Sequence, residues 1–127
     1  MDARFNDLGS NLVGGPSVPP KSHSASVTTG AGVAVDLVAA EGNCFLVAMT
    51  GTITGTPSFA VQAEESDTSG GSYTNVPTGG AVTVAAANTT YVITFKRTKR
   101  FLKVKATLTG TTSLEMGVSV FSTKKAT

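Results

Sequence analysis

The stretch TYVITFKRTKRFLKVKATL, residues 90–108, contains two alternating segments separated by a short basic run. In the first segment, Tyr91, Ile93 and Phe95 are apolar and recur at every second position. In the second segment, residues 101–108, apolar residues alternate with lysines and a threonine. An alternation with a period of two is typical of β-strands that bury one face. The stretch therefore predicts two antiparallel strands joined by a charged corner or a hairpin turn.

The same kind of pattern extends in both directions along the chain. Short apolar or alternating runs end at clusters of Gly, Ser, Asn or Asp, which favour turns, and we interpret Glu41-Gly42-Asn43 as one such turn. Residues 44–49 are apolar on both faces, as expected for a central strand. No segment repeats its apolar residues with the period of a helix. The further strands predicted in this way are residues 33–38, 44–49, 59–64, 72–76, 82–84 and 114–120.

Several short strands without helices predict an all-β fold, namely an antiparallel β-sandwich in which one face of each sheet is solvated. The strand order does not follow from the pattern, so jelly-roll, immunoglobulin-like and barrel arrangements stay open. The chain has 127 residues, which fits one domain. We expect an extended N-terminal arm at residues 1–24, the sandwich at residues 25–122 and a flexible tail at residues 123–127.

Composition limits the classes of function. Hydrophobic residues make up 40% of the chain and charged residues 14%, with a formal net charge of +2. Cys44 is the only cysteine, so we expect a buried thiol and no disulfide within the chain. The first residues do not match a secretory signal, and no apolar run is long enough for a membrane helix. We expect a soluble protein that is synthesised in the host cytoplasm.

The arm is predicted because its Gly- and Pro-rich part suits neither a helix interior nor a central strand. A floppy terminus is the alternative interpretation. The arm also carries apolar side chains that a simple linker would not need, which favours docking onto a partner. The arm residues predicted to contact a partner are Phe5, Leu8, Leu12, Val13, Pro19 and Pro20.

The basic run is the second candidate contact. Lys96, Arg97, Lys99 and Arg100 lie together between the two strands, and two further lysines follow on the second strand. Such a cluster can bind phosphates, can pair with an acidic protein surface, or can keep a sheet edge from aggregating. Nucleic-acid binding is the least favoured of the three, because the run lacks a surrounding set of aromatic residues and the overall charge is low.

The residues with catalytic potential do not form a recognisable site. His23 is the only histidine, and it falls in the arm, where no rigid surroundings would hold a general base. Glu64, Glu65 and Asp67 match no metal-binding loop and are interpreted as a solvated hairpin tip. We therefore expect no enzyme activity, no catalytic residues, no cofactor and no metal.

Two segments carry a family resemblance. One is FAVQAEESD at residues 59–67 with YTNV at residues 73–76, and the other is YVITFKRTKRFLKV at residues 91–104, followed by TLTG at residues 107–110. They resemble small β-sandwich proteins encoded near the major capsid gene of tailed bacteriophages. Tyr73 stands where that pattern often has Trp, and Phe101 stands where Tyr is common. The resemblance covers roughly residues 43–122 and implies a head decoration (cement) protein or another minor virion component.

The resemblance also implies the partners and the location. The chain is expected on the capsid surface of the virion, bound to the major capsid protein and to neighbouring copies of itself as a homo-oligomer, without a membrane. Two alternatives remain: a tail or fibre component, and a non-catalytic carbohydrate- or surface-binding β-sandwich. The second is less favoured because the chain has no Trp and only two Tyr.

Overall fold

The structure, a computed structural model, describes residues 12–38, 40–109 and 113–124. It contains ten strands and, within these residues, no helix. The predicted contacts Phe5 and Leu8 lie outside the described residues. The strands are β1 (Leu12–His23), β2 (Val35–Asp36), β3 (Ala40–Thr54), β4 (Ser58–Ser66), β5 (Thr74–Asn75), β6 (Thr78–Gly79), β7 (Ala81–Val84), β8 (Thr90–Lys96), β9 (Phe101–Thr109) and β10 (Ser113–Lys124).

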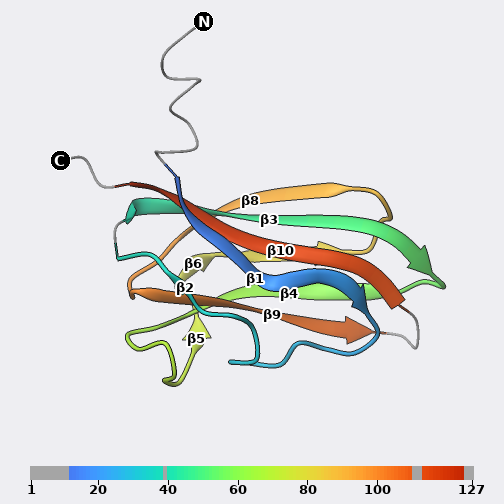
Figure 1. The fold of residues 1–127 in the computed structure, drawn as a ribbon, viewed down its shortest axis with the longest axis horizontal. Helices are drawn as coiled ribbons and strands as arrows, with labels where there is room; N and C mark the ends of the chain where they lie inside the picture. Colours follow the sequence, from blue (N-terminus) through green and yellow to red (C-terminus); the bar gives the residue numbers. More distant parts are fainter. Residues whose placement is uncertain (1–11, 39, 110–112, 125–127) are drawn as a thin grey trace, which may run out of the picture.

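The strands form two antiparallel sheets that pack face to face, which confirms the predicted β-sandwich. Sheet A has the strand order β1-β10-β3-β8-β6. Sheet B has the order β2-β9-β4-β5, and β7 also pairs with β4. Figure 1 shows β8, β3, β10 and β1 following one another in one layer, with β9 beside β4 in the other.

The connectivity identifies the sandwich as a jelly roll. The pairings are nested: β1 pairs with β10, β2 with β9, β3 with β8, and β4 with β7. The β10–β3 and β9–β4 pairings then join these four pairs into two sheets. A chain folded back on itself in this way gives the two Greek keys of a jelly roll, so the immunoglobulin-like alternative does not apply.

The core lies between the sheets and follows the predicted alternation. Tyr91, Ile93 and Phe95 of β8 face inward, as do Leu102 and Val104 of β9. The inward side chains of β3, β4 and β10 complete a single cluster, in which most members expose almost none of their surface. Burying aliphatic side chains of this size stabilises a fold by about 1.5–3 kcal/mol each. The alternating pattern therefore corresponds directly to the layer that holds the sandwich together.

Several predicted boundaries are wrong. Residues 41–43 do not form a turn, because β3 runs without a break from Ala40 to Thr54. The strand expected at residues 33–38 is reduced to Val35–Asp36, and Val33 and Val38 are about half exposed. At the other end of the chain, β10 extends to Lys124, past the predicted domain limit at residue 122.

The largest difference concerns the arm, because Leu12–His23 forms strand β1 and belongs to the sandwich. The Pro-rich composition does exclude a central strand, but it allows an edge strand, where only one side must be hydrogen-bonded. The β1–β10 register shifts between Pro16 and Val18 and again between Val18 and Lys21. These bulges accommodate the prolines while Val18 remains in the core.

Candidate docking surface

The outer face of sheet A carries no charged residue over the middle of its three central strands. Alternation places the side chains opposite the buried ones on this face. Met49 of β3 and Val92 of β8 expose 60% and 62% of their surface. Phe45 and Phe121 lie side by side, with ring centroids 6.4 Å apart. We call this surface the uncharged face; it comprises Asn43, Phe45, Val47, Met49, Thr90, Val92, Thr94, Gly117, Ser119 and Phe121.

A shallow hollow of about 210 Å³ lies on the same side of the sheet, between Pro20 and Met49. Gly117 forms its floor, and a Cβ atom at this position would lie 3.0 Å from the ring of Pro20. Pro20 therefore packs over the outer side of β10, and the predicted contact residue Pro20 does border the uncharged face. Lys21 and Glu115 stand at the rim of the hollow.

The outer face of sheet B is polar and charged by comparison. Lys103 and Lys105 of β9 lie there opposite Glu64 and Gln62 of β4. Lys103 donates a hydrogen bond to the carbonyl of Gly30 at 2.8 Å, and its Nζ sits 4.7 Å from the Tyr73 ring centroid. The two outer faces therefore differ: the middle of the sheet A face is uncharged, while the sheet B face carries charged side chains.

The basic run forms the corner between the two sheets, where the chain passes from β8 to β9. This excludes a hairpin turn at these residues. The corner is held from inside by Glu65, which is 3% exposed. The carboxylate of Glu65 accepts hydrogen bonds from Thr98 N (2.7 Å), Thr98 Oγ1 (2.6 Å) and Lys99 N (3.2 Å).

The two arginines of the corner are also engaged within the chain. The Arg97 guanidinium donates to Leu37 O at 2.8 Å and to Lys99 O at 3.0 Å. Arg100 makes a two-pronged contact with Asp36, at 2.9 Å and 2.7 Å. The Arg100 hydrogen bond and the backbone N–H of Val38 lower the pKa of Asp36 to about 2. Both arginines thus tie the corner to the segment around β2.

The predicted contact residues do not come together as one site. Lys96, Arg97, Lys99 and Arg100 share the corner at the β8 end of the sandwich. The prolines lie on β1, at the opposite edge of sheet A. Leu12 and Val13 pair with Thr123 and Ser122 at the start of β1. The uncharged face lies between the two groups, and it was not among the contacts predicted from the sequence.

His23 is buried and held by the backbone. Its Nε2 lies 3.0 Å from Met116 O and 3.2 Å from Pro19 O. Because carbonyl oxygens only accept hydrogen bonds, Nε2 carries the proton. The ring also packs edge-on against Phe59, with centroids 6.3 Å apart. The expectation that His23 belongs to an arm without rigid surroundings is therefore wrong.

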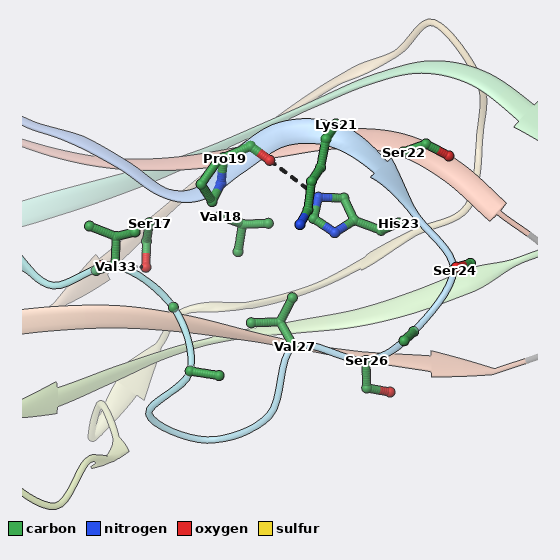
Figure 2. Close-up of a pocket in the computed structure, with 13 residues that line it drawn as sticks. Ser17, Val18, Pro19, Lys21, Ser22, His23, Ser24, Ser26, Val27 and Val33 are labelled. Carbon is green, nitrogen blue, oxygen red and sulfur yellow. Dashed lines mark hydrogen bonds between the residues drawn. The ribbon is translucent and has the colours of Figure 1, made fainter.

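A hollow of about 450 Å³ opens beside His23, between β1 and the segment that leads to β2. Figure 2 shows Lys21 and His23 pointing into it, near Val18 and Val27. Ser17 closes its far side, accepting from Val104 N at 2.9 Å and donating to Val33 O at 2.8 Å.

The acidic cluster is not a solvated hairpin tip, since Glu64 and Glu65 are buried on strand β4. Only Asp67 is exposed. The Glu64 carboxylate lies 4.0 Å from Lys105 Nζ, while the Glu65 carboxylate accepts hydrogen bonds from the corner. The described residues hold no group of three or more His, Cys, Asp or Glu side chains placed to share a metal ion. Cys44 is buried as predicted, and burial raises the pKa of its thiol.

Within the described ranges, no helix is long and apolar enough to cross a membrane. A scan against models of protein families finds no match to this chain. No protein with a curated description matches the sequence either. The resemblance to phage head proteins therefore stays a prediction.

Proposed function

We propose that this chain is a virion structural protein: a capsid decoration, or cement, protein that binds the assembled major capsid lattice and stabilises the head. The observation that carries the proposal is the contrast between the two sides of the sandwich. A module that lies flat on a protein surface needs one side whose desolvation costs little free energy. Its other side must remain hydrated. The uncharged face and the charged outer face of sheet B have these properties.

The proposed partner surface is apolar and uncharged, to match the uncharged face. Interfaces are depleted of charge at their centre and polar at their rim. Met49 and Val92 are the most exposed apolar side chains of this face, and the charged residues Lys21, Glu115 and Lys96 lie at its ends. Each contact can be weak, because a capsid repeats its sites and neighbouring copies can bind one another.

The viral part of the proposal rests on the sequence resemblance. The motif segments correspond to β4, β5, β8 and β9 and to the corner between β8 and β9. Residues such as Val61, Glu65 and Val104 are buried there. The motif thus supports a shared fold, while the uncharged face supports docking on the particle.

Copy number on purified particles tests the proposal. A decoration protein is expected at hundreds of copies per head, comparable with the major capsid protein. Heads that lack the chain are expected to break at a lower temperature and to regain stability when it is added back. A few copies per particle would instead indicate a tail or fibre component, and no retention on heads would contradict the proposal.

The contribution of the N-terminal residues is tested in the same assay. A truncation at residue 24 would remove β1 and damage the sandwich, so the informative variant removes residues 1–11 only. Loss of particle binding in this variant, with an unchanged unfolding temperature, is expected if Phe5 and Leu8 contact the capsid.

A further inference from the structure

The two edges of sheet A differ in how they are protected against strand addition. Exposed edge strands can pair with other chains, and natural proteins block this with prolines, bulges, charges or short length. Edge strand β1 contains Pro16, Pro19 and Pro20, which have no N–H to donate, and its register shifts twice. The edge strands of sheet B, β2, β5 and β7, have only two to four residues each.

The edge at β8 has none of these protections over most of its length. Strand β6 covers it only at Phe95 and Lys96. From Thr90 to Thr94, no strand in the described part of the chain pairs with its outer side. This part, TYVIT, contains no Pro, Gly or charged residue, and its aromatic and β-branched side chains favour strands.

The core is also incomplete along this edge. Tyr91 and Ile93 face inward but are only partly buried. Their partners in β3, Ala48 and Leu46, expose 0% of their surface. An additional strand beside β8 would cover Tyr91 and Ile93, and its backbone would satisfy the outward-pointing groups of β8.

We propose that this edge is a self-association site, at which β8 of one copy pairs antiparallel with β8 of a second copy. Strand β6 occupies the edge at Phe95, so the two-fold axis is placed near Tyr91. In this register Tyr91 lies opposite its own copy, and Thr90 lies opposite Val92 of the other chain. Pairs of aromatic and β-branched residues of this kind stabilise antiparallel strands.

The charges of the chain favour a second copy as the occupant. The paired segment is uncharged, so no like charges meet. Lys96 of one copy lies about ten residue rows from Lys96 of the other, or roughly 34 Å. This exceeds the screening length of about 8 Å at physiological salt. The pairing would also extend the two uncharged faces into one continuous surface.

The inference concerns contacts between copies and is independent of docking on a capsid. Analytical ultracentrifugation of the isolated full-length chain tests it. We expect a monomer–dimer equilibrium with a Kd of about 10–100 µM, as suits an interface smaller than the standard size. A chain that stays monomeric at millimolar concentration would overturn the inference and leave the proposed docking untouched.

Lysine variants locate the interface. Thr90→Lys combined with Val92→Lys places four lysines around the two-fold axis, and both positions are exposed, so the fold should tolerate them. We expect the Kd to rise at least about 30-fold. The matched control is Asn43→Lys combined with Met49→Lys, which adds the same charge to exposed positions of β3, one strand from the edge. Its Kd should stay within about twofold of the wild type.

A charge-pair variant tests the antiparallel register. Thr90→Glu combined with Val92→Lys places the introduced carboxylate of each copy beside the introduced ammonium group of the other, so association should recover and should weaken at high salt. A double-lysine variant that associates like the wild type would contradict the edge as the interface. Failure of the charge-pair variant to recover would contradict the antiparallel arrangement.

Discussion

Glu65 shows how one buried carboxylate organises the basic corner. It projects inward from β4 and accepts three hydrogen bonds from Thr98 and Lys99. The corner must reverse the chain between two sheets, which leaves backbone N–H groups without strand partners. The carboxylate satisfies two of these groups and balances part of the positive charge around them.

Replacing this carboxylate should therefore destabilise the fold. We expect Glu65→Gln to lower the free energy of unfolding by about 2–3 kcal/mol, because the amide group loses charge-assisted hydrogen bonds and turns a donor toward other donors. Urea denaturation measures the change. Asp67→Asn, at an exposed position just after the same strand, is the control and should change stability by less than about 0.5 kcal/mol.

The ion pair between Asp36 and Arg100 should make the stability of the folded state depend on pH in the acidic range. The pKa of Asp36 is about 2 in the folded protein, against an ordinary value of 3.8. A carboxylate with a lowered pKa stabilises the folded state fully above its unfolded pKa, and this contribution disappears as the pH falls toward the folded value. Stability should therefore decrease between about pH 4 and pH 2.

NMR titration of the Asp36 carboxyl carbon checks the pKa, and unfolding curves across this pH range check the effect on stability. In the variant Asp36→Asn the decrease should be smaller. An Asp36 pKa near 3.8 would contradict the observed contact with Arg100, because an exposed carboxylate without a cationic partner titrates near that value.

At the scale of elements, the passage from β6 to β7 carries the chain from sheet A to sheet B within a few residues. Gly79 and Gly80 make this step with φ angles of 74° and 81°. Other residues rarely adopt such angles. A Cβ atom at Gly79 would also lie 2.9 Å from the carbonyl oxygen of Thr94. Glycine at both positions therefore allows the crossing without backbone strain.

Replacing a glycine of this crossing by alanine should destabilise the fold. We expect Gly79→Ala to lower the free energy of unfolding by about 1–3 kcal/mol through backbone strain and the close approach to β8. Thermal and urea denaturation measure it. Gly70→Ala is the matched control, since a Cβ there meets nothing within 4 Å, and its effect should be near zero. Equal effects at the two positions would argue against the strained crossing.

The sequence correctly predicted the strands that bury only one face, because their apolar residues recur at every second position. The alternation in residues 90–108 predicted β8 and β9, because their inward side chains join the core and their outward ones do not. Strand β1 was missed because its prolines and glycines hide the pattern, and only the pairing with β10 shows that an edge strand fits there.

The candidate surface could be predicted only in part. Residues 44–49 are apolar on both faces, which correctly indicated a central strand. The pattern does not show whether the second face is covered. In the structure Phe45, Val47 and Met49 lie on the outer side of sheet A, and Met49 is mostly exposed. Conversely, the basic run is conspicuous in the sequence, yet Arg97 and Arg100 form hydrogen bonds within the chain.

The whole molecule is a jelly roll for which two distinct interaction regions are proposed. The uncharged face lies over β3, β8 and β10 and is proposed to rest on a capsid. The β8 edge is proposed to join copies side by side. Because the two regions are adjacent, paired copies would present a wider uncharged surface and would bind a repeating lattice more tightly than single copies.

The most direct test of the central claim is the binding of Met49→Lys to heads that lack the chain, measured by co-sedimentation. Burying an unpaired lysine should weaken binding at least about tenfold, because it costs more than about 1.4 kcal/mol. The control is Thr107→Lys, an exposed position on the outer face of sheet B, which should bind like the wild type. If Met49→Lys binds as tightly as the wild type, the uncharged face is not the docking surface.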